Sequence, residues 1–343
     1  MDFTFEPEAI EKVKQLVADN QIFAITTHYN SDGDAIGSST ALAEVLRQMG
    51  KTVKILLPND YPAFFRWMHG VEDILSLDRH SKEVQKFIAS MDVLICLDIN
   101  QLSRTEDLEH FFEQSNKPRI VIDHHINLQI EADAAFSFHK ASSTCELVYH
   151  ILCACGYEKF IDKHVAESLY TGIMTDTGRL DYSSNYPEVY DVMGILVGMG
   201  INKARIHDKI NNVFNYDRFR LQSAVMKDNF VYLPDYHAGY MFISNANKKE
   251  YNFQLGDSEG FVNMPLCIRD LKFVALFTEY EKGPVKASFR SKGDFPANEF
   301  ATELFNGGGH FNAAGGKYFG TLDEAIQAFK DGLEKYREKL DKK

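Results

Sequence analysis

The sequence has little cysteine, proline or tryptophan and no long hydrophobic run. Its 343 residues include five cysteines, nine prolines and one tryptophan. The cysteines are odd in number and form no CxxC pair, which argues against a disulfide framework and indicates reduced thiols. The N-terminus has no basic stretch followed by an apolar one, and no later window holds about 18 uncharged apolar residues. We therefore expect a cytoplasmic protein with no membrane partner.

Positive charge is also scarce. The chain carries 49 acidic against 37 basic residues and a formal net charge of −12. A surface of this sign repels long duplex nucleic acid. A small anionic substrate remains compatible with it, provided that bound cations and a few basic residues reverse the field locally. The length allows two domains, each with a substantial core.

Short apolar runs alternate with helical segments in the first half of the chain. The runs cover residues 22–28, 52–58, 92–99 and 119–125. Strands that alternate with helices predict an α/β fold, in which a parallel sheet carries crossover helices on its faces. In such sheets ligands gather outside the carboxyl ends of the strands, so the residues that end these runs are of special interest.

Three of these runs end in side chains that bind metals, and an aspartate in the segment MTDTG adds a fourth position. Each could instead serve turn or capping chemistry, as Asp34 could for a helix that starts near Ile36. Together they supply what a two-metal centre needs, namely imidazoles and several carboxylates, one of which bridges the ions. The predicted ligands are His28, Asp32, Asp34, Asp98, His124 and Asp176.

The donor types indicate which ions the centre would bind. No thiolate belongs to the set, which favours two divalent ions of the Mn²⁺ type, with Mg²⁺ as the second choice, over a structural zinc. Two such ions about 3.5–4 Å apart can activate a water molecule and clamp a phosphoryl oxygen for in-line attack. No protein nucleophile is then required. We therefore expect a hydrolase that acts on phosphate esters.

The order of the motifs carries a family resemblance. HYNSDGD, LDIN, DHH and MTDTG resemble the four motifs of the DHH phosphoesterase superfamily, and GGGHFNAAGG resembles the signature of the DHHA1 domain. The arrangement is most similar to the NrnA-like nanoRNase and pAp-phosphatase proteins, often named exopolyphosphatase-related. The resemblance implies a parallel-sheet DHH catalytic domain at 1–187, a helical linker at 188–222 and a smaller α/β DHHA1 domain at 223–343.

The resemblance also implies roles for individual residues. Asp98 would bridge the ions, Asp123 would support the ligating histidines, and His125 would contact the scissile phosphate. One ion would be held by His28, Asp32 and Asp98, and the other by Asp34, Asp98, His124 and Asp176. Arg104 follows the second motif and would either touch the substrate or cover the site. Asp181 departs from the family pattern, because relatives often have a basic or aromatic residue in this region.

Apolar runs after residue 222 predict a small second sheet, to which the resemblance assigns a substrate-binding role. Three consecutive glycines before His310 leave backbone N–H groups open to an anion, although a flexible hinge or a helix-capping loop is the alternative. Arg290 could grip a phosphate through two parallel bonds, or be an ordinary surface arginine. The predicted substrate-binding residues are Arg290, Gly308, Gly309 and His310. They would anchor a remote phosphate while the first domain cuts, with the active site between the two domains.

Several substrates fit these expectations. The leading ones are short oligoribonucleotides and 3′-phosphoadenosine 5′-phosphate (pAp), which would yield nucleoside monophosphates. Cyclic dinucleotides or the linear pApA are an alternative within enzymes. A non-catalytic nucleotide sensor or RNA-binding module is an alternative from another class, and it predicts a missing metal ligand, whereas none is missing here. The sequence does not rank these substrates, and it leaves a homodimer open.

Overall fold

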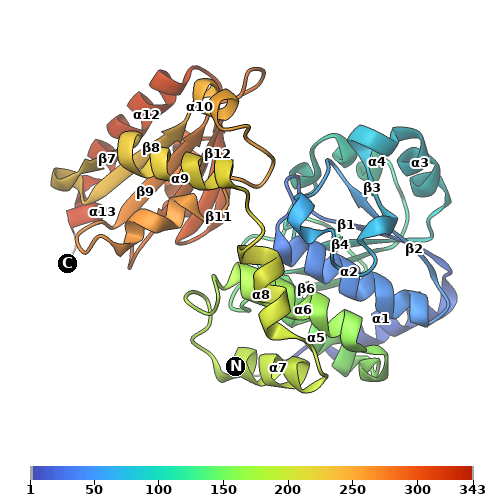
Figure 1. Cartoon of the computed structure of the whole chain (residues 1–343). Coiled ribbons are helices and arrows are strands. Elements are labelled where there is room, and N and C mark those ends of the chain that lie inside the picture. The colour runs from blue at the N-terminus through green and yellow to red at the C-terminus, as the bar shows by residue number, and fades with distance from the viewer. Residues whose placement is uncertain (1–2, 342–343) are drawn as a thin grey trace. The chain divides into compact units, whose positions relative to one another are not determined.

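The chain folds into two compact units, Met1–Val213 and Phe214–Lys343 (Figure 1). The computed structural model describes residues 3–341, so the outermost positions of the two predicted domains, 1–2 and 342–343, lie outside it. Each unit has its own sheet and its own helices. The division between them falls inside the segment 188–222 that the sequence predicts to be a linker.

The first unit is built on a six-stranded sheet with the order β3-β2-β1-β4-β5-β6 (Figure 1). Every neighbouring pair of strands is parallel, which confirms the predicted α/β architecture. The strand order reverses between β1 and β4, and in open sheets of this kind such a point opens a crevice at the carboxyl ends. The strands are β1 (Ile22–Thr26), β2 (Thr52–Leu57), β3 (Ile74–Ser76), β4 (Val93–Leu97), β5 (Arg119–Asp123) and β6 (Ala134–Ser137).

Helices cover both faces of this sheet, because its strands are apolar on both sides. Phe23 and Ile25 of β1 pack in a core with α1, α2, α5, α6 and α7, whereas Ala24 packs in a second core with α3 and α4. Near-continuous apolar runs are typical of strands buried on both faces. The helices are α1 (Pro7–Asp19), α2 (Gly33–Gln48), α3 (Leu77–Ser90), α4 (Glu109–Glu113), α5 (Thr144–Ala154), α6 (Lys163–Asp176), α7 (Pro187–Gly198) and α8 (Lys203–Asn211).

The turn between β1 and α2 differs from the capping alternative considered for Asp34. Helix α2 begins at Gly33, and Asp32 caps it, since its Oδ1 accepts from the backbone N–H groups of Asp34 and Ala35 at 3.0 and 3.1 Å. A Cβ atom on Gly33 would lie 2.2 Å from Oγ1 of Thr175, so the turn packs directly on α6. Asp34 therefore does not cap α2, and its carboxylate accepts from the backbone N–H groups of Thr144 and Cys145.

The second unit holds a mixed six-stranded sheet with the order β11-β12-β10-β9-β8-β7. Its strands are β7 (Phe230–Leu233), β8 (Ala238–Ile243), β9 (Phe273–Thr278), β10 (Val285–Ser291), β11 (Gly308–His310) and β12 (Ala313–Tyr318). Its helices are α9 (Tyr216–Asp228), α10 (Asn245–Glu250), α11 (Ala297–Leu304), α12 (Leu322–Lys335) and α13 (Arg337–Asp341). A phenylalanine-rich core lies under α11 and α12, and a second core lies under α9. Over residues 3–341, none of the helices combines the length and the apolar character that a bilayer span requires.

The three helices of the predicted linker are divided between the units. Helix α7 buries Val189 and Leu196 in the first unit, and α8 buries Ile206 in the same core. Helix α9 instead buries Leu221 and Val225 in the second unit. These segments are therefore packed parts of the two units.

The glycine-rich segment is neither a hinge nor a helix cap. Its residues form the antiparallel hairpin of β11 and β12, with Gly308 paired to Gly315 and His310 paired to Ala313. A Cβ atom on Gly307 would lie 2.0 Å from the carbonyl oxygen of Gly315. Close backbone approach within the hairpin thus explains part of the glycine content without any ligand.

Candidate metal centre

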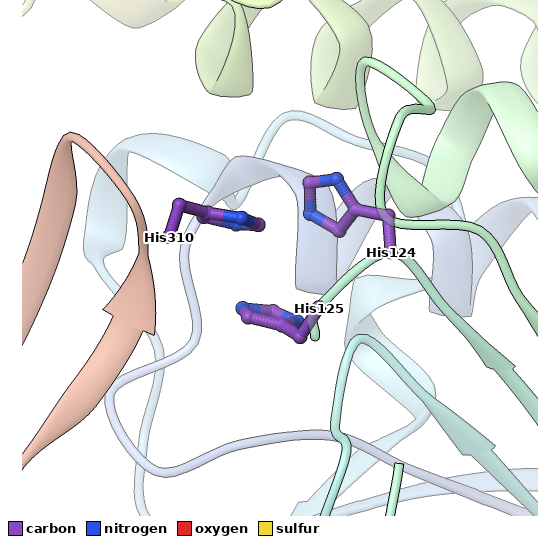
Figure 2. Close-up of side chains that lie close together, drawn as sticks. All are labelled: His124, His125 and His310. Carbon is purple, nitrogen blue, oxygen red and sulfur yellow. The ribbon is translucent and has the colours of Figure 1, made fainter. Parts of the chain in front are cut away.

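The predicted ligands of the first unit converge at the carboxyl ends of three central strands. His28 lies two residues beyond β1, Asp98 directly follows β4, and Asp123 is the last residue of β5. Figure 2 shows the rings of His124 and His125 extending from the segment that follows β5. Because β1, β4 and β5 are neighbours in the sheet, residues from positions 28 to 125 meet at one edge.

The ligand atoms form two groups that meet at Asp98. One group is His28, Asp32 and Asp98, and the other is Asp34, His124 and Asp176. Oδ2 of Asp98 lies 3.4 Å from Nε2 of His28, and Oδ1 lies 3.4 Å from Nε2 of His124. Donor atoms that share an ion about 2.1 Å away lie about 3.0–3.4 Å apart, so these separations suit metal binding. Each oxygen of Asp98 thus faces a different group.

Backbone carbonyls set the orientation of both candidate ligand histidines. Nδ1 of His28 lies 3.0 Å from the carbonyl oxygen of Tyr29, and Nδ1 of His124 lies 3.2 Å from that of Ala141. A carbonyl oxygen only accepts, so Nδ1 carries a proton and Nε2 is the nitrogen that each ring would offer to a metal. The sequence predicted that Asp123 would support these histidines, but backbone carbonyl oxygens, not Asp123, contact their Nδ1 atoms.

Asp123 instead holds His125. Its Oδ1 lies 2.7 Å from Nδ1 of His125, and its Oδ2 accepts from the backbone N–H of the same residue. On the other side of the ring, Nη1 of Arg104 lies 3.0 Å from Nε2, and it also donates to the carbonyl oxygen of Asp98. A guanidinium only donates, so Nε2 accepts and Nδ1 is the protonated nitrogen. Burial and then the charge of Arg104 lower the pKa of His125 well below its usual range, which keeps the ring neutral.

The electrostatics of the site suit divalent cations. Burial, and after it the charges of Asp98 and Asp176, raise the pKa of Asp34 well above its usual value. Burial alone would lower the pKa of His28, but hydrogen bonds to Asp32 and Asp98 raise it to about 10. The carboxylates thus attract positive charge into a buried place, and dications binding there would displace protons from the imidazoles.

The amino end of α5 completes the site, and sequence reasoning missed it. The backbone N–H groups of Thr144 and Cys145 donate to the two carboxylate oxygens of Asp34 at 2.7 and 2.9 Å. The hydroxyl of Thr144 donates to Oδ1 of Asp98 at 3.1 Å. Ser143 caps this helix by accepting from the backbone N–H of Glu146, and the S-x-x-E pattern is a sequence signal for such a helix start. That signal predicts the helix but not the carboxylates that it meets.

Helix α6 closes the site against Asp34. A Cβ atom on Gly172 would lie 2.1 Å from Sγ of Cys145 and 2.9 Å from Oδ1 of Asp34. The helix ends at Asp176, whose Oδ2 lies 3.4 Å from Nε2 of His124. Asp181 follows in the turn after α6, where it is exposed. Glycine at position 172 therefore allows α6 to bring Asp176 to the second group of ligands.

The residues predicted to bind substrate lie on the sheet of the second unit. His310, drawn in Figure 2 at the end of β11, pairs with Ala313 of β12, which in turn pairs with Arg290 of β10. Residues paired across strands point to the same face of a sheet. Phe289, the neighbour of Arg290, points to the core under α11 and α12. The side chains of Arg290 and His310 therefore share the face that points away from that core.

Comparisons with known proteins agree with the motifs. Residues 22–173 match the model of the DHH family, N-terminal domain, and residues 238–338 match that of the DHHA1 domain. Over 319 residues the chain is 30% identical to the bifunctional oligoribonuclease and PAP phosphatase NrnA of Thermus thermophilus, covering 92% of this chain and 89% of the relative. The protein of the same name from Bacillus subtilis is 23% identical, with 89% and 91% covered.

A solved structure is also similar over the whole chain. The crystal structure of an exopolyphosphatase-related protein from Bacteroides fragilis matches with a TM-score of 0.93 and 37% sequence identity, and the match covers 100% of both chains. Together with the two family models, this similarity accounts for both units. The chain therefore belongs to the DHH family, in the group whose members also carry a DHHA1 domain.

Proposed function

We propose that this chain is a metal-dependent phosphoesterase that hydrolyses short oligoribonucleotides and pAp to nucleoside monophosphates. The observation that carries the proposal is the position of Asp98, whose two oxygens each lie 3.4 Å from a histidine of a different ligand group. Relatives that align over most of the chain are named as bifunctional oligoribonucleases and PAP phosphatases, which supports this substrate class.

Two divalent ions are the proposed cofactors, with Mn²⁺ ahead of Mg²⁺. When bound, they supply an activated water molecule and positive charge for the phosphoryl oxygens. Imidazole and carboxylate donors suit these ions. The nearby thiol of Cys145 is not among the proposed ligands; its Sγ donates to the backbone carbonyl oxygen of Asp34 at 3.6 Å. The residues that would hold the ions are His28, Asp32, Asp34, Asp98, His124 and Asp176.

The other residues of the first unit would act on the substrate. His125 is held at both ring nitrogens, which fixes its ring beside the ligands and suits it to contact the scissile phosphate. Asp123 orients His125. The guanidinium of Arg104, which already contacts His125 and the backbone of Asp98, adds a positive charge that can stabilise the transition state.

The second unit would bind the part of the substrate that does not react. Arg290 and His310 share one face of its sheet, and a guanidinium together with an imidazole can hold a phosphate. Gly308 and Gly309 of the same hairpin are proposed to let the phosphate approach the backbone. A phosphate held at a fixed place favours substrates of two to five nucleotides or pAp over long duplexes, which the net charge of −12 also disfavours.

Turnover on a panel of substrates tests the proposal. The purified chain, supplied with Mn²⁺, is expected to release phosphate from pAp and nucleoside monophosphates from diribonucleotides, and EDTA is expected to stop both reactions. Preference for pApA or a cyclic dinucleotide would replace the substrate assignment. Tight nucleotide binding without turnover on any of them would instead support a sensor and contradict the enzymatic proposal.

Two further parts of the proposal concern the setting of the protein. We propose a cytoplasmic location, in keeping with the reduced state of the five cysteines, all of which are free thiols. We also propose a homodimer, which light scattering of the purified chain should show as twice the monomer mass; a mass of one chain would contradict this part.

A further inference from the structure

Thr144 occupies a special place among the residues around the ligands. It is fully buried and is the first residue of α5. Its backbone N–H donates to Oδ2 of Asp34, and its side-chain hydroxyl donates to Oδ1 of Asp98. Asp34 and Asp98 belong to different ligand groups. A single residue thus contacts both groups with hydrogen-bond donors and without being a ligand itself.

The backbone of Asp98 is already fixed, so the direction of its carboxylate is what remains to be set. Asp98 has a φ of +58°, a left-handed conformation that is uncommon for residues other than glycine. Its N–H donates to the carbonyl oxygen of Ile122, and its carbonyl oxygen accepts from Arg104. The remaining freedom is rotation of the side chain, and this rotation decides whether each oxygen faces a different ligand group.

In the structure His28 and His124 also lie within 3.4 Å of the oxygens of Asp98. Those contacts involve Nε2, the nitrogen that each histidine would offer to a metal, because Nδ1 faces a backbone carbonyl. A nitrogen whose lone pair binds a metal does not donate a hydrogen bond. The Thr144 hydroxyl can keep donating when metals bind, since no ligand role competes for it.

We propose that Thr144 is a positioning residue that orients the Asp98 carboxylate toward both ligand groups, while its backbone N–H fixes Asp34. This proposal rests on the proposed metal-dependent function. The hydroxyl matters through the direction that it gives to a ligand, which is how groups hydrogen-bonded to metal ligands usually act. The consequence should be visible in the binding of the metal itself and not only in turnover.

The test compares Thr144→Val with Thr144→Ser by calorimetric titration with Mn²⁺. Valine keeps the branched shape and removes the hydroxyl, whereas serine keeps the hydroxyl and removes a methyl group. We expect Thr144→Val to weaken Mn²⁺ binding about 10- to 100-fold, the usual range for groups that support a metal ligand. Thr144→Ser should stay within about threefold of the wild type, because its hydroxyl can still reach Asp98.

Thr40→Val is the matched control. Thr40 is also a buried threonine, but its hydroxyl bonds to backbone carbonyls of α2 and to Ser168, away from the ligands. Its replacement should lower the melting temperature without changing Mn²⁺ affinity. If Thr144→Val bound Mn²⁺ like the wild type, or if Thr144→Ser lost as much affinity as Thr144→Val, the positioning role would be overturned.

Two other outcomes are also informative. If both Thr144→Val and Thr144→Ala failed to fold, the hydroxyl would be needed for folding, and the positioning role would be overturned. A wild-type chain that binds no divalent ion would contradict the proposed function itself, which distinguishes that failure from a failure of the role of Thr144.

Discussion

Asp98→Asn is the substitution with the largest expected effect on the proposed activity. Asparagine keeps the shape of the side chain but removes the charge and replaces one oxygen with an NH₂ group, which cannot bind a metal. Because each oxygen of Asp98 faces a different ligand group, one group must lose a ligand whichever way the amide turns. The substitution also removes a negative charge that faces both ions, so it should weaken the binding of both, whereas removing a ligand of a single ion should weaken mainly that ion.

The magnitude follows from the charges. Two unit charges about 4 Å apart interact with about 4 kcal/mol at an effective dielectric constant of about 20, and a dication doubles this to about 8 kcal/mol. The amide oxygen that remains recovers roughly half of this interaction, which leaves about 4 kcal/mol. If this loss is expressed in the transition state, kcat/KM should fall about 1,000-fold.

Two quantities are measured: kcat/KM for pAp with Mn²⁺, and the rise in melting temperature that Mn²⁺ produces. The rise is the useful quantity, because Asp98 also contacts His28 and His124 directly, so that the absolute melting temperature should fall as well. Asp92→Asn is the control: Asp92 accepts from the backbone N–H groups of Gln21 and Ile22, at the opposite end of the sheet. A wild-type kcat/KM and a wild-type Mn²⁺ response in Asp98→Asn would show that Asp98 does not serve both ions.

Three other substitutions test His125, the second unit and a buried histidine outside the site. His125→Ala should lower kcat, because about 2.7–4 kcal/mol of transition-state stabilisation is lost, while bound Mn²⁺ is retained. Loss of the metal would show instead that His125 is a ligand. Arg290→Ala should raise KM for pAp about 10- to 150-fold, the effect of about 1.5–3 kcal/mol, but should leave hydrolysis of bis(p-nitrophenyl) phosphate nearly unchanged; equal losses would assign Arg290 to the fold. Burial lowers the pKa of His150 from 6.5 to about 4, so the unfolded chain binds the extra proton and stability falls as pH drops through that window. His150→Phe should remove this loss of unfolding free energy, which is at most about 3 kcal/mol and smaller because solvent screens the partly exposed ring. If urea unfolding at low pH gave the same curves for the variant and the wild type, this prediction would be wrong.

The parts of the site that follow strands could be predicted from the sequence. Apolar runs whose last residues include His or Asp indicate parallel strands whose carboxyl ends meet, and β1, β4 and β5 do meet there. Strands β3 and β6 escaped prediction because they have only three and four residues, too few for a periodic pattern. The hairpin of β11 and β12 escaped it because glycine-rich segments give no strand signal.

Contacts between distant parts of the chain could not be predicted. The hydrogen bond from Thr144 to Asp34 joins residues 110 positions apart, and only the packing of α5 against α2 and α6 creates it. The same holds for Asp123: the sequence indicates a residue that supports histidines, but the choice of His125 depends on how the backbone turns after β5. Local patterns thus predict which side chains gather, and the folded chain decides which of them touch.

Anomalous diffraction from crystals of this chain grown with Mn²⁺ tests the two-ion centre directly. We expect two manganese peaks about 3.5–4 Å apart, on either side of the Asp98 carboxylate. One peak would have His28 and Asp32 as further ligands, and the other would have Asp34, His124 and Asp176. A single peak, or two peaks that do not share Asp98, would contradict the proposed two-ion centre.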